Sequence, residues 1–170
     1  MKKCLLTLIT LTAAICLQAQ VSIIPRPANM TVGKGTFTVD RSTVIVIENA
    51  SLGKQAAFLK DYLTKIYQLN IPVRTGMAKS SSHAILLKNI RKQNEIKGAY
   101  QLEVTGSGIT ITGDDAEGVF YGVQSVIQLL PVQVSAKLQV PQVSIQDAPR
   151  FSYRGMMLDV GRHFFPVSFV

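Results

Sequence analysis

The sequence predicts an α+β fold in which one face of a sheet is covered by two helices. Short runs rich in β-branched and aliphatic residues recur between residues 35 and 145, and glycine, proline or polar turn residues separate them. Two longer segments, 54–69 and 115–130, instead repeat apolar residues every three or four positions, which is the period of a helix with one buried face. Several strands packed against two helices in this way form an α+β domain.

Residues 1–19 predict a secretory signal peptide. A basic start is followed by an apolar run over residues 5–17, interrupted only by threonines, and by the small Ala19 at the cleavage point. This run is too short to span a bilayer comfortably, and no later segment reaches the ~18 apolar residues that a membrane helix needs. A lipoprotein signal that ends at Cys16 is the alternative, although Ile15 stands where a small residue is expected. We therefore expect an exported mature chain, periplasmic or extracellular, without an integral membrane segment.

The composition argues against several classes of function. Cys4 and Cys16 both lie in the predicted signal, so the mature chain has no thiol for a disulfide, a nucleophile or a zinc site. His83 has no second histidine near it, and we expect neither a metal nor a cofactor. The formal net charge is +8, but the basic residues are spread along the chain. The densest basic cluster has no interleaved aromatic residue to stack on bases, which predicts a solvated loop and no nucleic-acid partner; it comprises Lys88, Arg91, Lys92 and Lys97.

The mature chain is expected to begin with an extended segment and two strands. Pro25 and Pro27 fix their own backbone conformation and push the residues before them out of the helical region. Strand-like runs follow over residues 35–39 and 43–47. The polar residues 40–42 between these runs predict a turn.

The first helix is predicted over residues 54–69. Asn70 and Pro72 end it, and residues 71–74 resume as a strand. Its apolar stripe recurs at spacings of three and four and is widened by two aromatic residues; it comprises Ala56, Phe58, Leu59, Tyr62, Leu63 and Ile66.

A short buried strand is predicted over residues 84–88, and a hairpin follows it. Residues 100–104 and 109–112 flank the sequence Thr-Gly-Ser-Gly, in which glycine allows the positive φ of a tight turn. The second arm alternates isoleucine with threonine, so one of its faces is expected to be buried and the other wet.

The second helix is predicted over residues 115–130, with Asp114 as its N-cap and Glu117 as the reciprocal partner of a capping box. Gly118 and Gly122 lie one turn apart, and in a soluble helix this spacing indicates close packing on the sheet. Pro131 stops the helix. The core-facing residues are expected to be Val119, Val123, Val126, Ile127 and Leu130.

Residues 141–149 predict a linker that carries a short strand over 143–145, and a new strand is predicted over 153–160. Met156, Met157 and Leu158 are continuously apolar, which suits a strand covered on both faces, as in a parallel barrel. A buried antiparallel strand would have the same pattern.

Three segments resemble the family 20 glycoside hydrolases, the β-N-acetylhexosaminidases. They are Ile-Pro-Arg-Pro at 24–27, Glu-Gly-Val-Phe-Tyr-Gly-Val-Gln-Ser at 117–125 with its Gln-Leu-Leu-Pro tail, and 150–166, which reads RFSYRGMMLDVGRHFFP. The resemblance implies that residues 20–148 are an accessory α+β domain. It also implies that residues 149–170 begin a (β/α)8 TIM barrel, whose first strand is present and whose remainder is truncated.

The resemblance places one candidate substrate-binding residue in this chain. Barrel active sites lie at the carboxyl ends of the strands, so Arg162 would emerge at that face if the strand ends near Asp159. In the family the matching arginine binds hydroxyls of the terminal sugar, and a guanidinium fork suits paired hydroxyls. A structural pair of Arg162 with Asp159 is the alternative. Asp159 and His163 are candidates to support the site, and Arg154, at the strand's start, is expected to be structural.

The resemblance also implies the chemistry of the longer protein, a retaining hydrolysis of terminal N-acetylglucosamine or N-acetylgalactosamine from glycans. The substrate's own acetamido carbonyl attacks the anomeric carbon, a Glu serves as acid and then base, and the adjacent Asp orients the acetamido group. That Asp–Glu pair is expected downstream, so no catalytic residue is assigned here and the 170 residues alone are expected to be inactive. Asp114, Asp115 and Glu117 imitate such a pair, but their place at a helix start predicts capping.

Two other interpretations remain open at this stage. One is a secreted module that binds glycans or another partner without catalysis, although a finished module would not be expected to end on an uncovered apolar strand. The other is a different glycosidase family that carries a similar accessory domain. Linkage preference, natural glycan and oligomeric state are not determined by the sequence.

Overall fold

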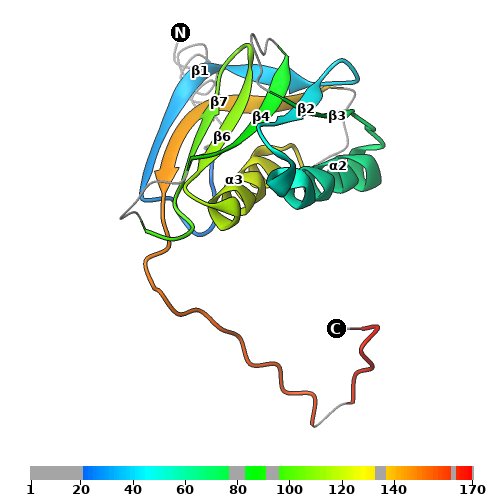
Figure 1. Ribbon diagram of the computed structural model, residues 1–170, viewed down its shortest axis with the longest axis vertical. Coiled ribbons are helices and arrows are strands. Elements are labelled where there is room, and N and C mark those ends of the chain that lie inside the picture. Colours follow the sequence, from blue (N-terminus) through cyan, green and yellow to red (C-terminus); the bar gives the residue numbers. More distant parts are fainter. Residues whose placement is uncertain (1–20, 77–82, 91–95, 133–136, 162–163, 170) are drawn as a thin grey trace, which may run out of the picture.

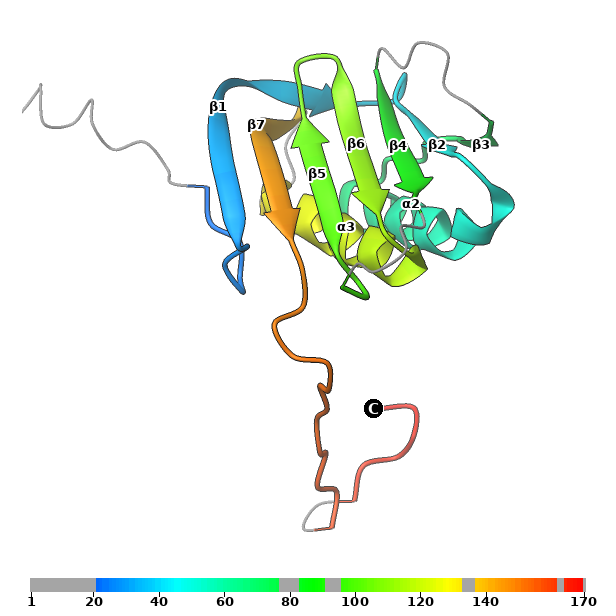
Figure 2. The ribbon, with the colours of Figure 1, turned by 60° about the vertical axis from the view of Figure 1, so that its left-hand side comes forward.

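The computed structural model describes residues 21–76, 83–90, 96–132, 137–161 and 164–169, and the predicted signal peptide lies outside these ranges. A seven-stranded sheet carries two helices on one face, and an extended segment follows the last strand (Figures 1 and 2). The strands are β1 (Asn29–Val39), β2 (Val44–Ile47), β3 (Val73–Thr75), β4 (Ala84–Asn89), β5 (Tyr100–Val104), β6 (Gly108–Gly113) and β7 (Leu138–Asp147). The helices are the 3₁₀ turn η1 (Ala50–Leu52), α2 (Gly53–Tyr67) and α3 (Ala116–Leu129).

The α+β prediction with both helices on one face is thus confirmed (Figure 2). The spatial order of the strands is β1-β7-β5-β6-β4-β2-β3. Strands β6, β4, β2 and β3 form a parallel half, whereas β1, β7 and β5 join it through antiparallel pairs. Parallel neighbours need a crossover, and α2 supplies the one between β2 and β3. Among the helices described here, none is long and apolar enough to cross a membrane.

The core lies between the helices and the covered face of the sheet. In the hairpin of β5 and β6, Ile109 and Ile111 are buried while Thr110 and Thr112 are only half-buried, as their alternation predicts. The largest fully buried side chains are Phe37, Ile45, Leu52, Leu59, Leu63, Ile71, Ile85, Leu87, Leu102, Ile109, Ile111 and Ile145. They come from both halves of the sheet and from α2, so one continuous core stabilises the domain.

The buried stripe of α2 is narrower than its sequence predicts. Ala56, Leu59 and Leu63 are buried, but Ile66 is 45% exposed and Phe58 is 42% exposed. The ring of Phe58 meets that of Phe120 of α3 edge-to-face, with the ring centroids 5.2 Å apart. This half-exposed aromatic residue therefore joins the two helices to each other.

The strand predicted over residues 143–145 is confirmed as part of β7, but the prediction of a linker around it is wrong, because β7 runs without a break from Leu138 to Asp147. Pro141, which suggested a linker, lies in the half of β7 that pairs with β1 alone. A proline is tolerated there because β5 does not pair with that part of β7. The missing N–H of Pro141 therefore removes no hydrogen bond to a second neighbouring strand. The strand lies between β1 and β5, so it is an interior strand of the antiparallel half.

Strand β1 is irregular along its contact with β7. The register shifts between Val32 and Thr36, where Gly33 and Gly35 lie opposite Gln142. Gly35 has φ of 122°, which glycine adopts without strain. The side-chain amide of Gln142 donates to the carbonyl of Lys34 at 3.2 Å and accepts the N–H of Gly106 at 3.0 Å when it is oriented to satisfy both of these groups. The side chain fills the space that the two glycines leave.

His83 lies just before β4 in a surface position, as predicted, but it is paired. Its Nε2 lies 2.9 Å from the Oδ1 of Asp40, to which the hydroxyl and the N–H of Ser42 also donate. The hydrogen bond from the Ser42 hydroxyl, followed by that from His83, lowers the pKa of Asp40 to about 2. The aspartate thus ties the turn after β1 to the start of β4.

Because the pKa of Asp40 is lowered on folding, its ionised form contributes stability above pH 3.8, and this contribution is lost as the pH falls through about 2. We expect Asp40→Asn to lower the free energy of unfolding at pH 6 by no more than about 1 kcal/mol, since the carboxyl is largely exposed. The difference should close below pH 2. Urea unfolding of both proteins at a series of pH values measures this, and a constant difference across the series would contradict it.

Candidate functional site

The predicted barrel strand forms no strand in this structure. Residues 152–160 are extended, and Tyr153, Met156 and Met157 are each more than four-fifths exposed. A strand requires a neighbour for its backbone N–H and C=O groups, and no residue that the structure describes pairs with this segment. The continuous apolar run 156–158 is therefore left uncovered by the part of the chain that the structure describes.

The predicted site residues are described only in part. Arg162 and His163 lie outside the described residues, so their roles stay predictions. Asp159 is exposed, and its Oδ1 accepts a hydrogen bond from the backbone N–H of Gly161 at 2.8 Å. This bond shapes the turn that follows the extended segment.

The acidic residues before α3 have the predicted structural role, with one correction. The N-cap is Asp115 rather than Asp114, because Asp115 has the extended backbone of a cap and accepts the N–H of Gly118 at 2.7 Å. Its other carboxylate oxygen accepts the N–H of Gly98 at 3.1 Å. Glu117, one place short of the capping-box position, pairs instead with Lys97 at 3.1 Å.

The segments that carry the family resemblance meet in space around one cavity of about 540 Å³, here called the junction recess. Pro25 and Arg26 come from the first segment, and Tyr121, Gln124, Ser125 and Gln128 come from the second with its tail. Arg150, Phe151 and Arg154 come from the third. No local pattern in the sequence predicts that these three segments meet, although each of them carries the family resemblance.

The first two segments are joined by a pair of hydrogen bonds. Gln128 of α3 accepts the N–H of Ile24 at 2.9 Å and donates to its carbonyl at 3.0 Å. A side-chain amide can satisfy both backbone groups of one residue in this way, as a neighbouring strand would. The segment around Ile24 is thereby held against the last turns of α3.

Tyr100 and Ser125 join the sheet to α3 beside the recess. The Tyr100 hydroxyl lies 2.6 Å from the Ser125 hydroxyl, and both residues are buried. Burial raises the pKa of Tyr100, and the nearby Asp147 acts in the same direction, so the phenol stays neutral and remains a hydrogen-bond donor.

We expect Tyr100→Phe to lower the free energy of unfolding by about 1–2 kcal/mol, because it removes a buried hydrogen bond and leaves the Ser125 hydroxyl without that partner. Ser125→Ala should cost a similar amount. The double variant should be less unstable than the sum of the two, by about 1 kcal/mol. Urea unfolding of the four proteins measures the coupling, and strictly additive losses would contradict the bond's contribution.

The recess is rich in positive charge. Arg26, Arg150 and Arg154 line it, and Asp147 is the one acid among the described residues around it. Asp147 also accepts the backbone N–H of Ala28 at 3.0 Å. Guanidinium groups donate hydrogen bonds to carboxylates and hydroxyls, so the charge of the described lining suits groups of that kind.

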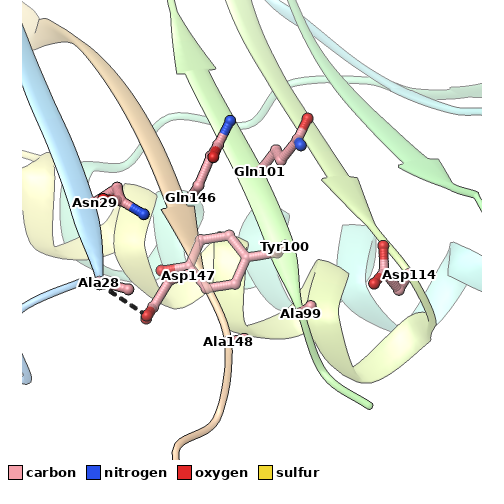
Figure 3. A pocket seen from close by; sticks show the side chains of 9 residues that line it. All are labelled: Ala28, Asn29, Ala99, Tyr100, Gln101, Asp114, Gln146, Asp147 and Ala148. Atoms are coloured by element: carbon pink, nitrogen blue, oxygen red, sulfur yellow. Dashed lines mark hydrogen bonds between the residues drawn. The ribbon is translucent and has the colours of Figure 1, made fainter. Parts of the chain in front are cut away.

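A shallower depression of about 230 Å³ adjoins the recess at the ends of β5 and β7, and the two share Tyr100, Asp147 and Ala148 (Figure 3). Asp147 lies beside Tyr100, while Asp114 stands on the far side of the depression, after β6 (Figure 3). The described residues hold no group of three or more His, Cys, Asp or Glu that could bind a metal ion.

The sequence and the fold match known proteins. A family model described as glycosyl hydrolase family 20, domain 2, matches residues 20–148. The chain is 35% identical over 154 residues to a beta-hexosaminidase of Porphyromonas gingivalis, which covers 87% of this chain and 20% of that relative. It is 32% identical over 143 residues to an N,N'-diacetylchitobiase of Vibrio harveyi, covering 84% and 15%.

Among solved structures, the GH20 beta-N-acetylhexosaminidase from Streptomyces coelicolor A3(2) matches with a TM-score of 0.71 and 30% identity, over 86% of this chain and 30% of that one. A GH20 exo beta-N-acetylglucosaminidase from Vibrio harveyi, in complex with N-acetylglucosamine, also matches with a TM-score of 0.71. This chain thus spans a fifth or less of the length of the two relatives compared by sequence.

Proposed function

The chain belongs to glycosyl hydrolase family 20, and from this premise we propose that it is the amino-terminal part of an exported β-N-acetylhexosaminidase. In this proposal residues 20–148 are the accessory domain, and residues 149–170 begin the catalytic barrel. The observation that carries it is the junction recess. The family segments 24–27, 117–125 with its tail, and 150–166 meet there, which is expected if the accessory domain supports a barrel placed directly after it.

The substrate class follows from the relatives rather than from a pocket of this chain. Their names include beta-hexosaminidase, N,N'-diacetylchitobiase and, for a Bifidobacterium bifidum relative, lacto-N-biosidase. We propose that the longer protein releases terminal N-acetylhexosamine from glycans by retaining catalysis, in which the substrate's acetamido group is the nucleophile. No Asp–Glu dipeptide occurs in the 170 residues, so the acid–base and its neighbour would come from elsewhere in the enzyme.

Within this chain, Arg162 is the proposed sugar-binding residue, with Asp159 and His163 in support. The longer enzyme is expected to release nitrophenol from 4-nitrophenyl N-acetyl-β-glucosaminide, and the 170 residues alone are expected not to. Arg162→Ala should lower kcat/KM roughly 10- to 100-fold, as the loss of charge-assisted hydrogen bonds does. Arg162→Lys keeps the charge but loses the fork, so it should restore activity only in part.

Three outcomes separate these statements. No hydrolysis of any N-acetylhexosaminide by the longer enzyme would refute the function. Hydrolysis by the 170 residues alone would refute the assignment of the catalytic acid outside them. If Arg162→Ala and Asp159→Asn lower the melting temperature together and leave kcat/KM unchanged, Arg162 is a structural partner of Asp159 and does not bind the sugar.

A further inference from the structure

The chain leaves the sheet through a close contact with α3. After β7, Pro149 packs beside Gly98 and Tyr121. A Cβ atom at Gly98 would lie 2.8 Å from Cε2 of Tyr121 and 3.1 Å from Cγ of Pro149, so only glycine allows this approach. Gly98 also has φ of 81°, and Asp115 holds its N–H. The ring of Tyr121 thus lies next to the point at which the chain leaves the domain.

Tyr121 also binds the departing chain five residues further on. The guanidinium carbon of Arg154 lies 5.0 Å from the centroid of the Tyr121 ring, and Nη2 of Arg154 donates to the Tyr121 hydroxyl at 2.8 Å. A cation over an aromatic face is attracted by the ring's quadrupole, and the hydroxyl adds a directional bond. Among the described residues 151–161, Arg154 alone has a side-chain hydrogen bond to the domain.

We propose that Tyr121 is a positioning residue that fixes the direction in which the chain leaves the accessory domain. Arg154 binds the Tyr121 ring and hydroxyl, and Pro149 lies against Gly98 next to that ring, so the segment between Pro149 and Arg154 is held close to α3 at both of its ends. Asp159 follows Arg154 by five residues, at most roughly 17 Å of extended chain. The orientation of that stretch is therefore set from α3. This inference stands on the contacts alone, and its effect on catalysis rests on the function proposed above.

Limited trypsin digestion of the 170-residue chain tests the contact. Trypsin binds the residue before the cleaved bond in an extended conformation, so that residue must first be released from its contacts with the rest of the protein. The Tyr121 contact should therefore slow cleavage after Arg154. Tyr121→Ala should raise that rate roughly two- to fivefold, the range expected for an exposed cation–π contact. Tyr121→Phe keeps the ring and should show a smaller increase. Tyr62→Ala is the matched control, because it truncates a half-buried tyrosine on the other helix.

Cleavage after Arg41, an exposed residue in the turn after β1, measures general loosening in the same digest. An unchanged rate at Arg154 in Tyr121→Ala, or an equal rise in Tyr62→Ala, would overturn the inference. If Tyr121→Ala does not fold, Arg154→Gln replaces it, because this residue is exposed and its change cannot disrupt the core. Nuclear magnetic resonance should then show the Tyr121 ring signals shifting towards those of a free tyrosine, and unshifted signals would also overturn it.

The longer enzyme tests the consequence for catalysis. Tyr121→Ala and Arg154→Gln should each lower kcat/KM two- to fivefold, and the double variant should be no worse than either, because both break one contact. Additive losses, or wild-type kinetics in all three, would overturn the positioning role. An enzyme without any hexosaminidase activity would refute the proposed function instead, and the digestion result would still decide whether the contact forms.

Discussion

Gly118→Ala is expected to lower the free energy of unfolding by about 3 kcal/mol, at the upper end of the cost of overpacking. A Cβ atom at Gly118 would lie 2.1 Å from the carbonyl oxygen of Ala99 and 3.1 Å from its carbon. That oxygen also accepts the N–H of Asp114, so it belongs to a fixed backbone bond. The first turn of α3 would have to move away from β5. Alanine's advantage of about 1 kcal/mol as a helix former is too small to offset this.

Gly53→Ala is the matched control for this substitution. Gly53 also lies in the first turn of a helix, with φ of −57°, and no atom lies within 4 Å of the position that its Cβ would occupy. We expect Gly53→Ala to be neutral or to stabilise by up to about 1 kcal/mol. Urea unfolding of both variants measures the contrast. Equal effects of Gly118→Ala and Gly53→Ala would show that the 2.1 Å approach of an added Cβ atom to Ala99 is relieved at little cost in the free energy of unfolding.

Leu102→Ala should lower the free energy of unfolding by about 2–5 kcal/mol, the range for truncation of a buried leucine. Leu102 is fully buried in β5 and lies opposite Ile111 on one neighbouring strand and Ile145 on the other. Both partners are themselves buried, so the surrounding strands cannot collapse into the space without breaking their registers. The loss of contacts and the cavity therefore add together.

Leu158→Ala makes the same chemical change at a position that is 54% exposed. It should alter the free energy of unfolding by no more than about 0.5 kcal/mol. Thermal or urea unfolding of Leu102→Ala and Leu158→Ala separates the effect of burial on the free energy of unfolding from the effect of losing the same side-chain atoms. A large effect of Leu158→Ala would mean that the extended segment contributes to the stability of the domain.

The helices and the hairpin could be predicted because their signals are local. The helical repeat of apolar residues that predicts α3 is contained in a short stretch of sequence, and so are the glycines that predict the β5–β6 hairpin. Both the helix and the hairpin form as predicted. The order of the strands is not a local property. β7 pairs with β1 and β5, and β2 lies beside β4, through contacts that no short-range pattern encodes. This is why β7 resembled a linker in the sequence.

The junction recess was missed for the same reason. Ile24 and Gln128 are 104 positions apart, and Arg154 follows Tyr121 by 33. Each belongs to one of the three segments that carry the family resemblance, and that shared resemblance is the only sequence signal that links them. The N-cap was misplaced by one residue because two aspartates stand side by side, and backbone geometry decides which of them caps.

The irregularity of β1 also bears on how separate molecules meet. β1 and β3 are the two edges of the sheet, and an edge offers unpaired N–H and C=O groups to any passing strand. β3 has three residues, which is too short to template a partner, and the register shift and paired glycines break the outer rim of β1 into two pieces. Neither border is a long, straight surface on which a second copy could align. An irregular edge strand of this kind is one of the features by which proteins limit edge-to-edge pairing.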